Sequence, residues 1–315
     1  MLNRRFLRTK VFQALYAHEQ SAGGSAAKHE KELLLGLDRT YGLYIHLLLL
    51  VGEMRRLAEN RIDGRKAKRM PTQEDLAPNR YFVDNPFLVK LSESRVLLEE
   101  SEKRKVGWVG EKDLLTQLYK RVEASAEFNE YMAAGTRSEA AERKLLVDLF
   151  VEHIAQDPGL HEHVEARSIH WLEDLDLACT MVKRTLETMA LRDADIHLDG
   201  PGEDAAEERE FITTLYRNTI QNKEEDERLI AERARNWEAD RITLSDMLLM
   251  RMALTEARSF ELIPVKVTLN EYIEIAKAYS TPKSKNFING ILDKLFAEMK
   301  ENGTIHKVGR GLLEH

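Results

Sequence analysis

The densest group of side chains that could bind a metal or transfer a proton is a run of histidines in the middle of the chain. His161-Glu162-His163 lies between His153 and His170. On a helix, residues two positions apart point about 200° away from each other, so His161 and His163 cannot hold the same ion. Zinc-protease spacing and paired Glu-x-x-His motifs are absent from the sequence. The histidines therefore predict a solvated helix face and no metal site.

The other residues that could take part in catalysis or ligand binding also have patterns that favour structural roles. Cys179 lies in an apolar helical pattern, which indicates a small buried side chain. The segment Gly107-Trp108-Val109-Gly110 lacks the spacing of a phosphate-binding loop and a preceding strand. We therefore predict no catalytic residue, no cofactor and no enzymatic activity. One cysteine in 315 residues also excludes an intramolecular disulfide framework and is typical of a reducing, cytoplasmic compartment.

Local charge gives a stronger indication of binding. The net charge of −7 excludes a generally basic nucleic-acid binder. The first ten residues nevertheless hold four cations and no acid: Arg4, Arg5, Arg8 and Lys10. Helical spacing places Arg5, Phe12 and Tyr16 at neighbouring angles, where guanidinium and aromatic groups can contact phosphates and unpaired bases. A second basic cluster comprises Arg61, Arg65, Lys66, Lys68 and Arg69. For any single cluster, a solvated helix face is the alternative interpretation.

The elements that must position these residues are helices. Apolar residues recur at spacings of three and four, and no segment shows sustained strand-like alternation. We expect helices at residues 3–20, 30–60, 88–104, 114–134 and 138–156, with further helices up to 199 and from 203 to 300. Residues 64–86 contain three prolines and many charges, which predicts a loop or extended connector. The longest apolar run, residues 43–51, is too short to cross a membrane. The predicted fold class is all-α.

Three segments near the C-terminus have individual physical features and a family resemblance. They read DRITLSDMLLMRMALTEA from Asp240, IPVKVTLNEYIEIAK from Ile263 and SKNFINGILDKL from Ser284. In the second segment we expect a buried stripe that includes Val267, Ile273 and Ile275. In order and spacing, the three segments are similar to the signature of the NusB family of bacterial transcription antitermination factors. The basic first helix, which includes Gln13-Ala14-Leu15-Tyr16, also resembles that family.

The resemblance implies a NusB-like compact helical bundle, enlarged here by an additional helical region. It implies a transcription antitermination factor that binds boxA-type single-stranded RNA in rRNA leader transcripts. The implied partners are NusE, a small-subunit ribosomal protein, and the RNA polymerase antitermination complex. The RNA-binding residues carried over from the family are Arg4, Arg5, Arg8, Lys10, Gln13, Ser284, Lys285 and Phe287. Tyr16 and Glu256 would contact a protein partner. The family commonly has an acidic residue where this chain has Lys283, which leaves the RNA contact there open.

The resemblance covers about residues 1–20 and 208–296, so a large part of the chain is additional. We expect an RNA-binding bundle at residues 1–20 and 208–300, and an inserted helical region at 25–205 that packs on the bundle and has no assigned role. Residues 301–315 form a tail whose last residues resemble a purification tag. Two other functions stay open: an RNA-binding module related to the N-terminal domain of rRNA cytosine methyltransferases, and a helical protein-interaction scaffold. A homodimer is also compatible with the sequence.

Overall fold

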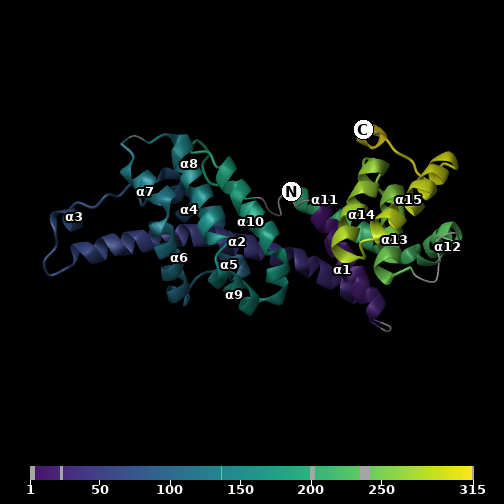
Figure 1. Cartoon of the computed structure of the whole chain (residues 1–315), viewed down its shortest axis with the longest axis horizontal. Coiled ribbons are helices and arrows are strands. Elements are labelled where there is room, and N and C mark those ends of the chain that lie inside the picture. The colour runs from purple at the N-terminus through teal and green to yellow at the C-terminus, as the bar shows by residue number, and fades with distance from the viewer. Residues whose placement is uncertain (1–3, 22–23, 136, 199–202, 235–241, 314–315) are drawn as a thin grey trace. The chain divides into compact units, whose positions relative to one another are not determined.

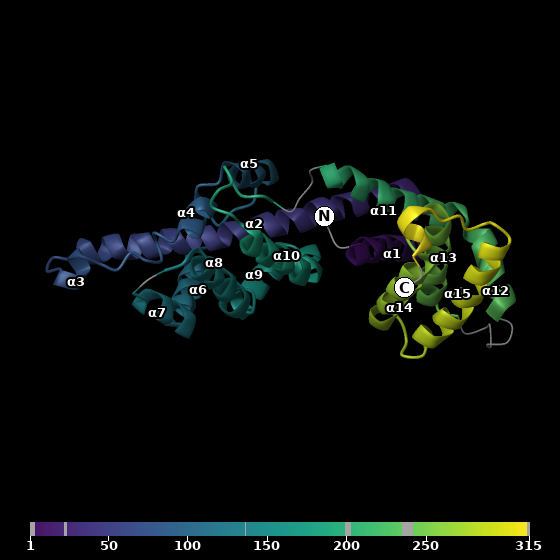
Figure 2. The same ribbon diagram turned by 90° about the horizontal axis from the view of Figure 1, so that it is seen from above.

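The computed structural model describes residues 4–21, 24–135, 137–198, 203–234 and 242–313. These residues form helices and no strand, which confirms the predicted all-α class. The chain divides into two compact units, which are described one at a time (Figures 1 and 2). The first unit combines residues 1–35 with 200–315, and the second spans residues 36–199. The division falls inside the long helix α2 (Ala26–Lys66).

The first unit is a bundle built around α13. Its helices are α1 (Arg4–Gln20), the start of α2, α11 (Glu203–Gln221), α12 (Lys223–Ala234), α13 (Leu244–Ser259), α14 (Val265–Tyr279), α15 (Ser284–Glu301) and a short 3-10 turn (Gly309–Leu312). Helix α13 packs against α1, α11, α12, α14 and α15 (Figure 1). Every residue of α13 from Leu248 to Ala257 is buried. A helix covered on all sides forms the core of its unit, so any charge on it needs an internal partner.

The buried face of α14 differs from the predicted stripe. Val267 is 42% exposed, so its predicted burial was wrong, whereas Ile275 is buried as expected. The residues that face the core include Val265, Thr268 and Tyr272, at helical spacings of three and four. The prediction failed because it followed apolar residues only. Two members of the buried face are polar, and their hydroxyl groups bind a carboxylate on α13.

The second unit surrounds the rest of α2. Its helices are α3 (Gln73–Leu76), α4 (Pro86–Ser92), α5 (Arg95–Arg104), α6 (Lys112–Ala124), α7 (Ala126–Ala133), α8 (Glu139–Asp148) with a π-helical continuation (Leu149–Ile154), α9 (Pro158–Arg167) and α10 (Ile169–Thr188). In this unit α5 lies on the opposite side of α2 from α6 and α7 (Figure 2). Helix α2 therefore forms the axis on which the unit packs.

Two segments predicted as single helices are each broken by a serine. The Ser94 hydroxyl accepts a hydrogen bond from the Leu97 backbone N–H at 3.1 Å, and Ser125 does the same for Phe128 at 3.2 Å. Both serines cap the N-terminus of a new helix, α5 and α7 respectively. The expected connector at 64–86 is also partly helical, because α2 continues to Lys66 and Thr72 caps α3.

Helix α2 is long and apolar enough to cross a membrane, the only such helix within the described ranges. Its most apolar window is 67% buried inside the protein. Burial of this kind is typical of a core helix, because a lipid-facing helix leaves its apolar side chains uncovered. The composition of α2 therefore does not indicate a membrane protein.

The predicted solvated histidine face was wrong for His163, whose side chain is only 11% exposed and packs against the core of the second unit. Its Nε2 atom lies 3.2 Å from Nε2 of His46, a fully buried residue of α2. The His46 ring stacks on Trp108 at a centroid distance of 4.0 Å, and the Trp108 indole N–H donates to the His46 carbonyl oxygen. Burial, with smaller contributions from Arg167 and His163, lowers the pKa of His46 to about 3. This histidine is therefore neutral in the folded protein at pH 7.

We expect the second unit to lose stability as the pH falls below 6.5. In the unfolded chain His46 gains a proton near its ordinary pKa of about 6.5, whereas the folded chain resists protonation until about pH 3. The free energy of unfolding should therefore fall by about 2 kcal/mol between pH 7 and pH 5 through this residue alone. Urea denaturation at several pH values measures the loss. His46→Phe should remove most of it, and His170→Gln, on the exposed side of α10, should keep it; equal pH profiles for the two variants would contradict the assignment.

Candidate nucleic-acid interface

Helix α1 presents cations at the surface of the first unit. Its buried residues hold it on α11, α13 and α14 and include Leu7, Val11, Phe12 and Leu15. The Arg5 side chain is 48% exposed, and Arg4 and Lys10 are partly exposed. Each of the latter two lies near an aromatic ring: the Arg4 guanidinium is 4.7 Å from the Phe211 centroid, and the Lys10 amine is 5.3 Å from that of Phe6. Cation–π contacts of this kind restrain long side chains without neutralising their charge.

Arg5 also connects α1 to α14. Its Nε and Nη2 atoms donate to the two carboxylate oxygens of Glu271 at 2.9 and 2.8 Å. These hydrogen bonds raise the pKa of Arg5, so its positive charge is secure. The pair is partly solvated, and such pairs contribute at most about 1 kcal/mol. A phosphate can therefore compete with Glu271 for this guanidinium.

Arg8 has a different environment from the other cations of α1. Its side chain is 2% exposed, and its Nε and Nη2 atoms donate to both carboxylate oxygens of Glu256 at 2.7 and 2.8 Å. The same carboxylate accepts hydrogen bonds from the hydroxyl groups of Thr268 at 2.8 Å and Tyr272 at 3.2 Å. Burial opposes the charge on Arg8, but the attraction of Glu256 outweighs it and raises the pKa of Arg8. The sequence predicted that Arg8 contacts RNA and Glu256 a protein partner, but both side chains are buried and bind each other.

The middle of α1 meets the end of α14. The Gln13 side-chain amide donates to the Tyr279 hydroxyl at 3.4 Å. The ring of Phe12, which is buried, lies 5.3 Å from the ring of Tyr279 and 6.1 Å from that of Tyr16. Tyr16 is 37% exposed and Tyr279 is 40% exposed. These contacts place two accessible aromatic rings beside the basic face of α1.

The start of α15 follows closely after Tyr279. The Ser284 hydroxyl is buried and donates to the Asp246 carboxylate at 2.9 Å, and Ser280 donates to the same carboxylate at 2.5 Å. Ser284 therefore fixes the turn before α15 to α13, whereas the sequence predicted an RNA contact for its side chain. Lys285 is exposed and Phe287 is partly buried. Lys283, the departure from the family pattern, is exposed as well.

Most of the predicted RNA-binding side chains are exposed or partly exposed on α1 and at the start of α15. The hydrogen bond between Gln13 and Tyr279 joins α1 to the end of α14, which is followed by the exposed Lys283 and by Lys285 at the start of α15. Sequence reasoning missed Tyr279, which contributes an exposed ring between the two groups, and Asp246, which anchors the turn. Tyr279 stands just before the third family-like segment, but nothing in the sequence pairs it with Gln13.

The family model for NusB matches residues 182–297. This part of the chain is a NusB-family domain. Three curated relatives carry the name transcription antitermination protein NusB. The protein of Salinibacter ruber is 45% identical over 105 residues, covering 33% of this chain and 66% of the relative. The protein of Chloroherpeton thalassium is 45% identical over 106 residues, covering 34% of this chain and 50% of the relative. The protein of Symbiobacterium thermophilum is 40% identical over 94 residues, covering 30% of this chain and 61% of the relative. No solved structure matches the chain significantly.

The matched region spans less than two thirds of the length of each of these relatives. The NusB domain begins at residue 182, inside α10, and ends at residue 297, inside α15. Helix α1 lies outside the match but packs directly on α11, α13 and α14. The suspected family membership is therefore confirmed for the C-terminal third, and the family role of α1 stays a prediction.

Proposed function

We propose that this chain is a transcription antitermination factor that binds boxA-type single-stranded RNA of rRNA leader transcripts together with NusE. The observation that carries the proposal is the NusB domain at residues 182–297, whose curated relatives are named for transcription antitermination. The partners proposed are the RNA, NusE and the RNA polymerase antitermination complex, in the cytoplasm. The protein acts by binding, without catalysing a reaction.

The proposed RNA-binding surface is the exposed side of α1 and the first turn of α15. Its members are Arg4, Arg5, Lys10, Gln13, Lys285 and Phe287. The cations contact phosphates, and the neighbouring aromatic rings stack on unpaired bases. Arg8 and Ser284 are positioning residues, since their buried bonds to Glu256 and Asp246 hold α1 and the turn in place. Tyr16, which is exposed on α1, is the proposed contact for a protein partner.

The rest of the chain is proposed to be an insertion into this binding module. The proposed binding module comprises residues 1–20 and 208–300. The insertion comprises residues 25–205, and the tail comprises residues 301–315. The compact units divide at slightly different places, after residues 35 and 199, because the start of α2 packs in the first unit. The Arg217 guanidinium, for example, donates to Glu30 at 2.9 and 2.6 Å.

RNA binding by the whole chain tests the proposal. Fluorescence anisotropy should show tighter binding to a boxA-type RNA than to a scrambled sequence, and NusE should strengthen the preference. With three to four cations on phosphates, log affinity should fall with log salt with a slope of about −2 to −3. Failure to bind boxA-type RNA at low salt, with and without NusE, would refute the function. Binding to NusE alone under those conditions would favour the protein-interaction scaffold.

A further inference from the structure

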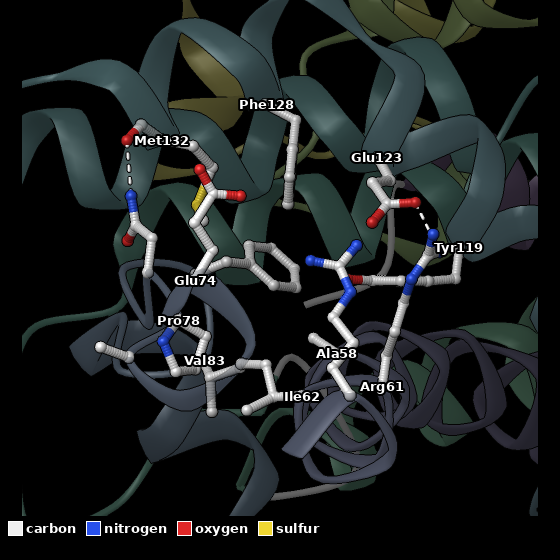
Figure 3. A pocket seen from close by; sticks show the side chains of 14 residues that line it. Ala58, Arg61, Ile62, Glu74, Pro78, Val83, Tyr119, Glu123, Phe128 and Met132 are labelled. Atoms are coloured by element: carbon white, nitrogen blue, oxygen red, sulfur yellow. Dashed lines mark hydrogen bonds and ion pairs between the residues drawn. The ribbon is translucent and has the colours of Figure 1, made fainter. Parts of the chain in front are cut away.

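A pocket of about 420 Å³ lies within the second unit, between α2, α3, α6 and α7 (Figure 3). This volume is in the range of small-molecule binding sites. None of the residues that line it belongs to the surface proposed above for boxA-type RNA. The pocket therefore needs an explanation of its own.

One wall of the pocket is apolar and partly aromatic. It is formed by Ala58, Ile62, Phe82, Val83, Phe128 and Met132. The rings of Phe82 and Phe128 pack on each other at a centroid distance of 5.1 Å. Both phenylalanines are buried, which makes this wall rigid. A wall of this kind favours the flat, apolar face of a ligand over a hydrated ion.

Two arginines of α2 line the same pocket. The Arg61 Nη1 atom lies 2.5 Å from a carboxylate oxygen of Glu123, which holds the guanidinium at the pocket (Figure 3). A guanidinium has five N–H donors, so the ion pair leaves donors for a ligand. Arg65 has no acidic partner among the residues that the structure describes and is exposed. A planar guanidinium group donates paired hydrogen bonds that match the oxygens of a phosphate.

The remaining polar groups of the pocket differ in what they can offer. Glu74 of α3 lies apart from the Arg61–Glu123 pair (Figure 3) and supplies a carboxylate acceptor. The Asn79 side chain is largely engaged within the protein: it donates to the Met132 carbonyl oxygen at 2.7 Å and accepts from the Tyr81 backbone N–H at 2.9 Å. The Tyr119 hydroxyl group, whose pKa burial raises to about 12, supplies a further donor. The pocket thus combines phosphate donors, an apolar wall and a separate acceptor.

We propose that this pocket binds a nucleoside monophosphate unit. The phosphate contacts Arg61 and Arg65, the base lies on the wall formed by Phe82, Phe128 and Met132, and an exocyclic amino group donates to Glu74. A carboxylate accepts hydrogen bonds from amino groups of bases but repels the carbonyl oxygens of uracil. The expected ligands are therefore adenine, cytosine or guanine nucleotides, either free or as part of an RNA strand.

The exposed end of α2 supports the RNA strand as one source of the nucleotide. Lys66 and Arg69 follow Arg65 and are exposed, and the Lys68 amine lies 3.0 Å from Asp75. Together with the arginines of the pocket they form the second basic cluster of the sequence. Neighbouring phosphates of a strand can contact such a cluster, whereas the single phosphate group of a free nucleotide can contact only part of it. The proposal does not depend on the function assigned to the NusB domain.

Methyl NMR on the whole chain with labelled methionine tests the pocket directly. Met132 lines it, and its signal can be assigned by comparison with Met132→Leu. Titration with AMP, CMP or GMP should shift the Met132 signal at lower concentration than UMP, and inorganic phosphate alone should leave it in place. Arg65→Ala should weaken the response about tenfold or more, whereas Lys112→Ala, an exposed cation of α6, should not. Glu74→Gln should remove the discrimination against UMP.

The outcomes separate the sources of the ligand. A shift with free nucleotides supports a small-molecule site, and a shift only with a short RNA supports a second RNA contact. No Met132 shift with either ligand overturns the proposal. An equal shift in the Arg65→Ala variant, or with an acidic peptide in place of nucleotides, also overturns it. A loss of boxA-type RNA binding with an intact Met132 response would refute the proposed function alone.

Discussion

Replacing Arg8 with methionine is expected to destabilise the first unit by about 3–5 kcal/mol. The methionine side chain fills similar space but leaves the Glu256 carboxylate, which is fully buried, without its cation. The hydroxyl groups of Thr268 and Tyr272 cannot replace two charge-assisted hydrogen bonds. The loss should appear as a lower urea midpoint and as faster amide exchange in α1 and α13.

Arg5→Met is the matched control for this experiment. It removes an arginine from the same helix that also binds both oxygens of a glutamate, here Glu271 of α14, but the Arg5 side chain is 48% exposed. Its expected cost is at most about 1 kcal/mol. Adding Glu256→Gln to Arg8→Met should restore part of the lost stability, because a neutral amide tolerates burial better than an unpaired carboxylate. Equal effects of Arg8→Met and Arg5→Met would contradict the structural role given to Arg8.

The role of Arg8 shows where the sequence was informative and where it was not. Arg8 precedes Phe12 and Leu15 by four and seven residues, so helical spacing already places it on the buried face. Its charge favoured a surface role, and its partner Glu256 lies 248 positions further along the chain. A buried ion pair between distant segments leaves no local pattern. The helices themselves were predictable because periodicity and capping act over a few residues.

Helix breaks inside the second unit illustrate a different limit. The serines that cap α5 and α7 were visible in the sequence, but apolar spacing continues across both of them. Continuous periodicity therefore concealed two real boundaries. For the pocket lined by Arg61, Glu74 and Phe128, the sequence showed only the basic cluster that includes its arginines, since the lining residues come from separate helices and from the segment after α3. Only packing brings them together.

The family motifs, in contrast, could be identified from the sequence, because they lie within one contiguous region. The three C-terminal segments form α13, α14 and α15, which pack on one another. Their match to the NusB family is confirmed at residues 182–297. Buried hydrogen bonds such as that between Ser284 and Asp246 explain how a motif residue can serve the fold in place of a ligand. Motif membership identified the domain but did not separate positioning residues from surface residues.

Removing the exposed cations of α1 should weaken RNA binding by about 10²- to 10³-fold at 50 mM salt. Each phosphate contact on a single strand contributes about 0.7 to the salt slope, and three contacts are removed by Arg4→Gln, Arg5→Gln and Lys10→Gln. The salt slope should become shallower by about 2. Arg8 is excluded from this variant, because its loss would mix unfolding with weaker binding. Anisotropy titrations with boxA-type RNA at several salt concentrations measure both quantities.

A second triple variant controls for the change in net charge. Arg217→Gln, Arg228→Gln and Lys294→Gln remove the same number of cations from exposed positions on α11, α12 and α15. If only overall charge attracts RNA, both variants should lose affinity and slope equally. If the RNA contacts α1 directly, the control should keep most of its affinity and nearly its full salt slope. Equal losses would remove α1 from the RNA-binding surface, and circular dichroism of both variants would confirm that the helices are intact.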